Sequence, residues 1–262
     1  MQAQKVPAKH GLNWVADGYR LFAKSPLLLT LLIFGYFFIL VASTVLPIVG
    51  PLAALILVPT FSVGLMVACR SLDVGHAVEW KQLFAGFHLN FPALLRLGFV
   101  YLASMASILM VSSLLDGGML MKMTLFGIPP PVDNFLDDDL ARARALTLVL
   151  SVPVIMGFWF APVLAAWHRL PATKSLFFSY FACARNLSAL LVFTLVLMGT
   201  VLALSLLYAL LDSLAGEALA EAMSMPVFLI LTAVLCASVY ASYRDIFRDD
   251  PPADLPEQQP GS

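Results

Sequence analysis

The chain has 262 residues, of which 61% are hydrophobic and only 12% are charged, and its mean hydropathy is +0.91. A soluble globular domain carries about 25% charged residues, and folding alone cannot hide this much apolar surface from water. The formal net charge of −1 gives no basic field for nucleic acid, which excludes that class of partner. The composition therefore predicts an integral membrane protein.

Six apolar segments are long enough to cross a bilayer as helices, which requires roughly 20 residues each. Backbone groups in lipid must be hydrogen-bonded within the segment, and the alternation of a membrane β-strand is absent. We therefore expect an all-α, polytopic fold with one transmembrane domain, residues 26–243. The expected spans are residues 26–47, 50–69, 92–115, 145–167, 188–211 and 225–243.

Basic residues are distributed unequally between the two sets of loops, and this bias sets membrane orientation. One set of loops, together with both ends of the chain, holds Lys5, Lys9, Arg20, Lys24, Arg70, Lys81, Arg96, Arg169, Lys174, Arg185, Arg244 and Arg248. The other set holds only Lys122, Arg142 and Arg144 among many acids. We therefore expect a cytoplasmic N-terminal segment, residues 1–25, and a disordered cytoplasmic tail, residues 244–262, which is acidic and rich in proline.

Amphipathic segments are expected on the cytoplasmic side before span 1, between spans 2 and 3, and between spans 4 and 5. Between spans 2 and 3, four aromatic residues recur at steps of four, three and four, which places their rings on one face of a helix from about Ala77. Such a helix lies in the headgroup region with its rings toward lipid. The candidate lipid-contact residues are Trp14, Phe22, Arg70, Trp80, Phe84, Phe87, Phe91, Phe177 and Phe181.

Residues 61–95 and 160–191 resemble each other. Each stretch reads as an inward span, an arginine at the cytoplasmic edge (Arg70 or Arg169), an aromatic-rich connector, and an outward span after an asparagine. Both copies run in the same direction, unlike the inverted repeats of many transporters. The pattern suggests a parallel duplication, and chance matches between apolar segments leave that interpretation open.

A metal site is the sharpest chemical alternative. Asp73, His76, Glu79 and His88 fall in one short stretch and are residue types that bind metals. The HExxH spacing is absent, so we interpret them as the polar rim of a turn and a surface helix. The methionines of "MLMKM", residues 119–123, are interpreted as membrane-facing filler rather than a copper site. No catalytic residue, metal or cofactor is therefore predicted.

The six expected spans contain no ionisable side chain near mid-membrane, where such groups mark ion and proton pathways. This counts against an ion-coupled carrier. A small-solute permease that does not couple transport through an intramembrane charge remains the alternative function.

The stretches "GLNWVADGYRLF", "ACRSLDVG" and "LFAGF" resemble a family of uncharacterised polytopic inner-membrane proteins of Gram-negative bacteria. In that family's pattern an acidic residue often follows the glycine, and His76 stands there in this chain. A more distant likeness is to the membrane-spanning portions of some glycerophosphodiester phosphodiesterases, whose catalytic domain has no counterpart here. The resemblance implies a location and an architecture, and no activity.

We therefore expect an integral protein of the bacterial inner membrane with both termini in the cytoplasm and no enzymatic activity. Membrane lipids are its expected partners, in a lipid-interacting or accessory role in the envelope. Whether it also associates with further copies of itself or with other membrane proteins is left open by the sequence.

Overall fold

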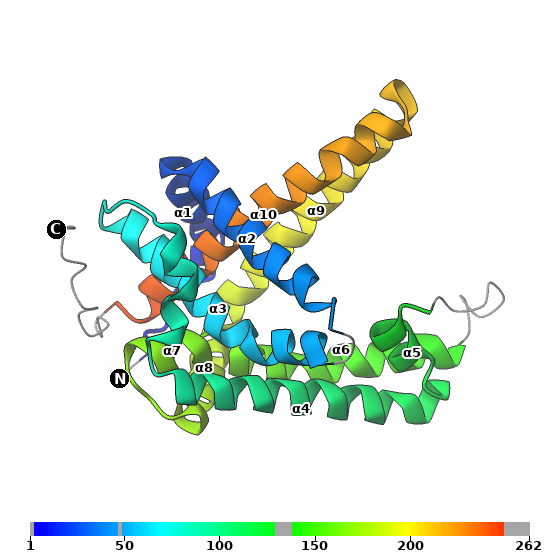
Figure 1. The fold of residues 1–262 in the computed structure, drawn as a ribbon, viewed down its shortest axis with the longest axis horizontal. Coiled ribbons are helices and arrows are strands. Elements are labelled where there is room, and N and C mark those ends of the chain that lie inside the picture. The colour runs from blue at the N-terminus through cyan, green and yellow to red at the C-terminus, as the bar shows by residue number, and fades with distance from the viewer. Residues whose placement is uncertain (1–2, 47–48, 129–137, 249–262) are drawn as a thin grey trace.

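The structure is a computed structural model that describes residues 3–46, 49–128 and 138–248, and all regular secondary structure in the part described is helical (Figure 1). The elements in chain order are α1 (His10–Lys24), α2 (Pro26–Ser43), α3 (Val49–Asp73), the 3₁₀ helix η1 (Trp80–Phe87), α4 (Phe91–Asp116), α5 (Met119–Phe126), α6 (Asp138–Phe158), α7 (Ala161–Trp167), α8 (Ala172–Arg185), α9 (Leu187–Ala215) and α10 (Glu217–Ile246).

The six expected spans are all present as helices long and apolar enough to cross a membrane: α2, α3, α4, α6 with α7, α9 and α10. The 26 residues of α4 extend about 39 Å at 1.5 Å per residue, which exceeds the hydrocarbon thickness of about 30 Å. Two spans begin earlier than the sequence suggests, α6 at Asp138 and α10 at Glu217. The all-α, polytopic fold is confirmed.

The span expected over residues 145–167 is divided into α6 and α7. Pro162 lies in the first turn of α7, where its missing N–H costs nothing. Its ring would clash with the carbonyl of the residue four positions earlier, Phe158, and α6 ends there. The break leaves the Phe160 N–H free to donate to the Ser179 hydroxyl of α8 at 2.9 Å. The proline therefore ends one helix and lets the connector attach at the break.

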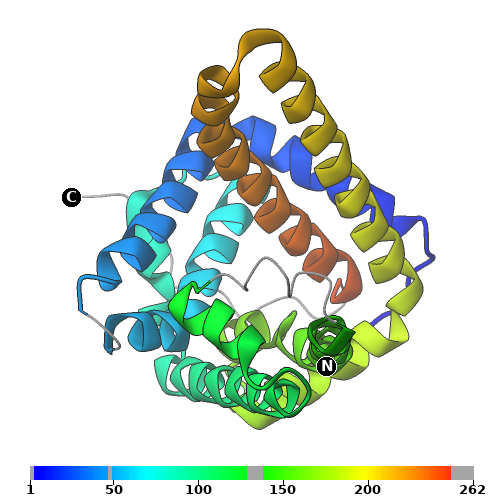
Figure 2. The same cartoon turned by 90° about the vertical axis from the view of Figure 1, so that its right-hand side faces the viewer.

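The helices divide the molecule into two ends. At the connector end lie α1, η1, α7 and α8, together with both ends of the described chain (Figure 1). At the hairpin end the chain turns from α2 to α3, from α4 through α5 toward α6, and from α9 to α10 (Figure 1). Helix α10 runs through the middle, in contact with α1, α2, α3 and α9 (Figure 2). The pair α9 and α10 diverges from α4 and α6 toward the hairpin end (Figure 1).

The two halves of the sequence repeat have the same order of elements. Helix α3 is followed by η1, which packs back on it, and then by α4; α6 and α7 are followed by α8, which packs back on them, and then by α9. An asparagine precedes each outgoing helix, Asn90 before α4 and Asn186 before α9. A third unit of this kind is formed across the two ends of the chain, because α1 packs on α10 and leads into α2.

Candidate functional site

Helix α8 exposes its aromatic face and buries its small and polar residues. Phe177 and Phe181 are 58% and 53% exposed, and their ring centroids lie 4.5 Å apart. Ser175 and Ser179, on the other face, are completely buried against the protein. The Ser179 hydroxyl donates to the Met156 carbonyl at 2.8 Å while accepting from Phe160. A helix facing water shows the opposite distribution, since exposed contiguous apolar surface marks a contact with lipid or protein.

The connector η1 has the same inverted distribution. Its buried residues are Gln82, Leu83 and Gly86, whereas Trp80 is 69% exposed. The Gln82 amide nitrogen donates to the Ser71 hydroxyl at the end of α3, at 3.1 Å, whereas its Oε1 is buried and has no hydrogen-bond partner among the described residues. Burying an amide and exposing an indole is unfavourable in water and favourable when the exposed ring meets lipid.

The expectation of an α-helix from Ala77 was wrong, because the chain is extended at Glu79 and then winds as a 3₁₀ helix from Trp80. The physical reason is backbone contact with α3. A Cβ at Gly64 of α3 would lie 2.6 Å from the Leu83 carbonyl carbon, and one at Gly86 would meet the Thr60 carbonyl. The narrower 3₁₀ helix places positions i and i+3, here Leu83 and Gly86, on one face toward α3.

The four aromatic residues of this segment nevertheless form a continuous run of ring contacts. Successive centroids lie 6.4 Å apart from Trp80 to Phe84, 6.3 Å from Phe84 to Phe87, and 5.3 Å from Phe87 to Phe91. Phe84 is exposed, whereas Phe87 and Phe91 are half-buried. The buried ring of Phe61 in α3 packs edge-on against Phe84 and Phe87 and anchors the run to the protein.

The N-terminal helix α1 differs from the two connectors. Trp14 and Phe22, expected at the lipid interface, are only 1% and 7% exposed. The Trp14 ring packs edge-on against Phe193 of α9, and the apolar face of α1 is covered by α9 and α10. Helix α1 therefore buries Trp14 and Phe22 in the protein, because the adjoining spans cover that face of the helix, whereas Tyr19 stays exposed.

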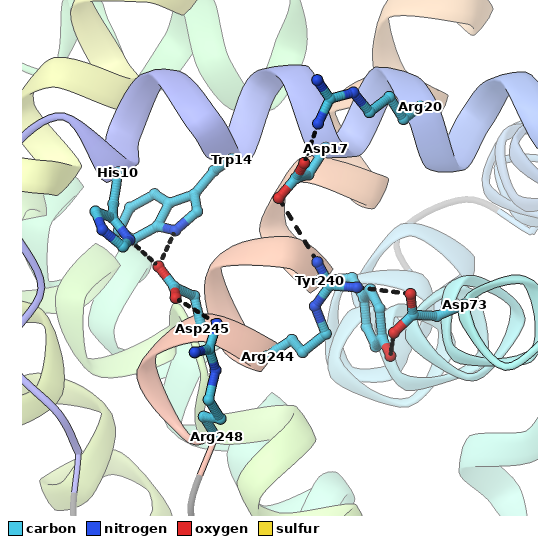
Figure 3. A network of polar contacts seen from close by, with 9 residues as sticks. All are labelled: His10, Trp14, Asp17, Arg20, Asp73, Tyr240, Arg244, Asp245 and Arg248. Carbon is cyan, nitrogen blue, oxygen red and sulfur yellow. Dashed lines mark hydrogen bonds and ion pairs between the residues drawn. The ribbon is translucent and has the colours of Figure 1, made fainter.

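A network of polar contacts joins α1, α3 and α10 at the connector end (Figure 3). Asp73, at the end of α3, accepts hydrogen bonds from Arg244 at 2.6 Å and from the Tyr240 hydroxyl at 3.0 Å. Arg244 also lies 3.6 Å from Asp17 of α1, which accepts from Arg20 at 3.0 Å. No local pattern in the sequence indicates this network, because its members are far apart along the chain.

Asp245 is the centre of a second group of contacts (Figure 3). Its Oδ2 accepts from the Trp14 indole at 2.9 Å and lies 2.6 Å from His10 Nδ1. Its Oδ1 forms an ion pair with Arg248 at 3.7 Å. The carboxylate thus attaches the start of α1 to the last turn of α10.

The four residues considered as a metal site do not converge. Asp73 is directed to α10, whereas His76, Glu79 and His88 are exposed. Across residues 3–46, 49–128 and 138–248, no three His, Cys, Asp or Glu side chains are grouped as a metal site requires.

Arg70 lies one turn before Asp73, half-buried at the end of α3. Its guanidinium carbon is 5.3 Å from the centroid of the Trp167 ring in α7, which is a cation–π geometry. The sequence predicts Arg70 at the membrane edge, and no pattern in it predicts the contact with Trp167. The fold alone brings the two residues together.

Six membrane-crossing helices, with two connectors that expose aromatic rings, define a polytopic helical membrane protein. The chain is 38% identical over 214 residues to a protein of Burkholderia thailandensis named as a probable inner membrane protein, and the match covers 78% of each chain. This chain belongs to the same family and is a multi-pass protein of the inner membrane. No family model and no solved structure matches it. None of these comparisons shows the distant likeness to glycerophosphodiester phosphodiesterases.

Proposed function

We propose that this inner-membrane protein has a non-catalytic, lipid-interacting role, with its connector end and both termini in the cytoplasm. The observation that carries the proposal is the inverted distribution of side chains on η1 and α8. Trp80, Phe177 and Phe181 are exposed while Gln82 and Ser179 are buried. Rings in this position belong at the boundary between headgroups and acyl chains, where an aromatic body and a polar edge are both accommodated.

Charge supports the same orientation. Lys81 of η1 and Lys174 of α8 are exposed beside the rings, and Arg96 and Arg185 are exposed at the same end. Each basic group near an anionic leaflet contributes about 1 kcal/mol of attraction. Aromatic rings and basic residues together favour a surface that lies on the cytoplasmic leaflet.

Reporter fusions test the orientation. Fusions after residues 174 and 250 are expected to report the cytoplasm, and fusions after residues 130 and 218 the periplasm. The reverse result at any one of these loops would contradict the proposed arrangement.

Quenching of tryptophan fluorescence tests the lipid contact. In vesicles whose acyl chains are brominated near the headgroup, bromolipid should quench part of the tryptophan fluorescence of the wild-type protein. This quenched part of the fluorescence should be smaller in Trp80→Phe. It should be unchanged in Trp14→Phe, since Trp14 is buried. Aqueous iodide should quench the Trp80 component weakly. Strong iodide quenching of Trp80 with no bromolipid effect would place this ring in water and refute the lipid contact.

Uptake measurements separate this function from the permease alternative. Proteoliposomes containing the protein are expected to be no more permeable to small solutes than protein-free vesicles. Saturable uptake of any solute would replace the proposed role with transport.

A further inference from the structure

A cavity of about 150 Å³ lies at the connector end, where α3, α7 and α10 finish. We call it the arginine cavity. Figure 3 shows three of its residues, Tyr240, Arg244 and Arg248. Its lining consists of three arginines and four aromatic residues: Arg70, Trp167, Tyr240, Tyr243, Arg244, Phe247 and Arg248. A cavity of this size exceeds the 10–15 Å³ that one water molecule needs about tenfold, so it can hold a small polyatomic group.

The three arginines differ in their ion pairing. Arg244 is paired with Asp73 and Asp17, and Arg248 with Asp245. No ion pair joins Arg70 to a carboxylate within the part of the chain that the structure describes. The uncompensated charge of the lining is therefore that of Arg70.

Two hydrogen-bond donors of this lining lack acceptors. Among the described residues, Arg70 Nη1 and Trp167 Nε1 are both buried without a hydrogen-bond partner. Burying an unsatisfied donor is costly because the atom has lost its water, and in half-buried Arg70 this cost falls on Nη1. The Trp167 ring face offsets part of the cost for Arg70 and offers no acceptor to either N–H. An acceptor with negative charge would satisfy both donors.

We propose that the arginine cavity binds the phosphate group of an anionic ligand. Arg70 and the Trp167 indole N–H donate to its oxygens, while Arg244 and Arg248, whose charges are paired with carboxylates, line the rest of the cavity. A phosphate offers several acceptor oxygens, and guanidinium groups bind it in bidentate geometry. Basic pockets between membrane helices on the cytoplasmic side receive lipid headgroups. The aromatic walls, including Phe247, suit the apolar part of such a lipid.

Two features of the site oppose an anion. Helices α3, α7 and α10 present their C-terminal ends, which carry partial negative charge. Asp73, close by, is a further negative charge, although it does not line the cavity and is neutralised by Arg244. Binding must therefore come from the direct contacts of Arg70 and Trp167, and it should weaken steeply when either donor is removed.

The test measures binding of two probes to the full chain in mild detergent: short-chain phosphatidylglycerol, and inorganic phosphate. Arg70→Gln should weaken binding at least ~10-fold, since a charge-assisted hydrogen bond is lost. Trp167→Phe keeps the ring, removes one N–H, and should weaken binding several-fold. Arg169→Gln is the matched control, because Arg169 is the repeat counterpart of Arg70, is exposed, and does not line the cavity.

The two probes identify the source of the phosphate. Arg70-dependent binding of the lipid alone supports a headgroup site, and Arg70-dependent binding of inorganic phosphate supports a site for a soluble phosphate. Equal affinities of Arg70→Gln and Arg169→Gln for both probes would overturn the proposal. If Arg70→Gln fails to fold, Trp167→Phe with unchanged affinity would overturn it equally.

The test also has an arm for competition by the chain's own acidic sequence, which begins at Asp249. A chain ending at Arg248 that binds the probes when the full chain binds neither would show that this sequence is the anion, and would overturn the proposal. The inference is independent of the lipid contact of Trp80. Bromolipid quenching reports on η1, and probe binding reports on the cavity, so either can fail alone.

Discussion

Asp73, at the end of α3, accepts a hydrogen bond from Arg244, in the last turn of α10, at 2.6 Å. The two residues are 171 positions apart in sequence. The same carboxylate accepts from the Tyr240 hydroxyl, one helical turn before Arg244. This pair joins the second span to the sixth at the connector end.

Asp73→Asn is expected to loosen the contact between α3 and α10. The Arg244 side chain is 47% exposed, so solvent screening limits the coupling to about 1 kcal/mol. A double-mutant cycle that combines Asp73→Asn with Arg244→Gln, with thermal unfolding in detergent as the measurement, gives this coupling energy. Additive effects of the two substitutions would show that the ion pair contributes nothing to stability.

Gly18→Ala should lower the midpoint of thermal unfolding. A Cβ at this position would meet the Ser238 hydroxyl and lie 2.6 Å from the Ser238 backbone nitrogen, so α1 must move away from α10. Gly199→Ala is the matched control, because a Cβ there meets nothing within 4 Å and alanine favours helix by about 1 kcal/mol. Opposite shifts of the two midpoints are expected. A neutral Gly18→Ala would show that α1 does not pack against α10 as described.

Asn186→Ala should release the segment that precedes α1. The fully buried amide accepts from the Val6 N–H at 2.8 Å and donates to the Gln4 carbonyl at 2.9 Å. Removing it leaves the buried Val6 N–H without this acceptor, at a cost of about 1–3 kcal/mol, and removes the donor to the Gln4 carbonyl. Limited proteolysis should then cleave near Lys5 or Lys9. Asn13→Ala, at an exposed position, should leave the cleavage pattern unchanged.

Cys183 of α8 should react slowly with maleimide. Burial raises the pKa of its thiol to about 12, so little reactive thiolate is present at neutral pH. Raising the pH should speed labelling by increasing the thiolate fraction. Lys174→Cys, at an exposed position on the same helix, should react rapidly from the connector side of the membrane. Equal rates for the two thiols would show that this face of α8 is not buried.

Much of the fold could be predicted locally. The length of each apolar segment predicts a membrane span. The turn after α3 is predicted from Gly75, whose φ of +83° falls in the left-handed region that glycine tolerates. The break between α6 and α7 depends on Pro162, which the sequence displays, but whether a proline kinks a span or divides it depends on what accepts the freed N–H. Here Ser179, 19 positions after Phe160, accepts the Phe160 N–H and so allows the division.

The candidate site was only partly predictable. The rings from Trp80 to Phe91 were visible as a pattern, and their contacts follow it. Trp14 lies in a similar amphipathic pattern but is buried in the protein. Amphipathicity predicts that one face of a helix is apolar, and it does not predict whether lipid or protein covers that face. Protein and lipid are equivalent to such a face until the neighbouring helices are placed.

The sequence by itself determined the membrane class, the number of spans and the unequal placement of charge, because bilayer thickness and backbone hydrogen bonding leave few alternatives for so apolar a chain. Only the tertiary structure decided which charges meet. His10 and Asp245 are 235 positions apart, and Arg70 meets the Trp167 ring from another helix. Such contacts depend on helix packing, which brings together helix ends that no local pattern relates.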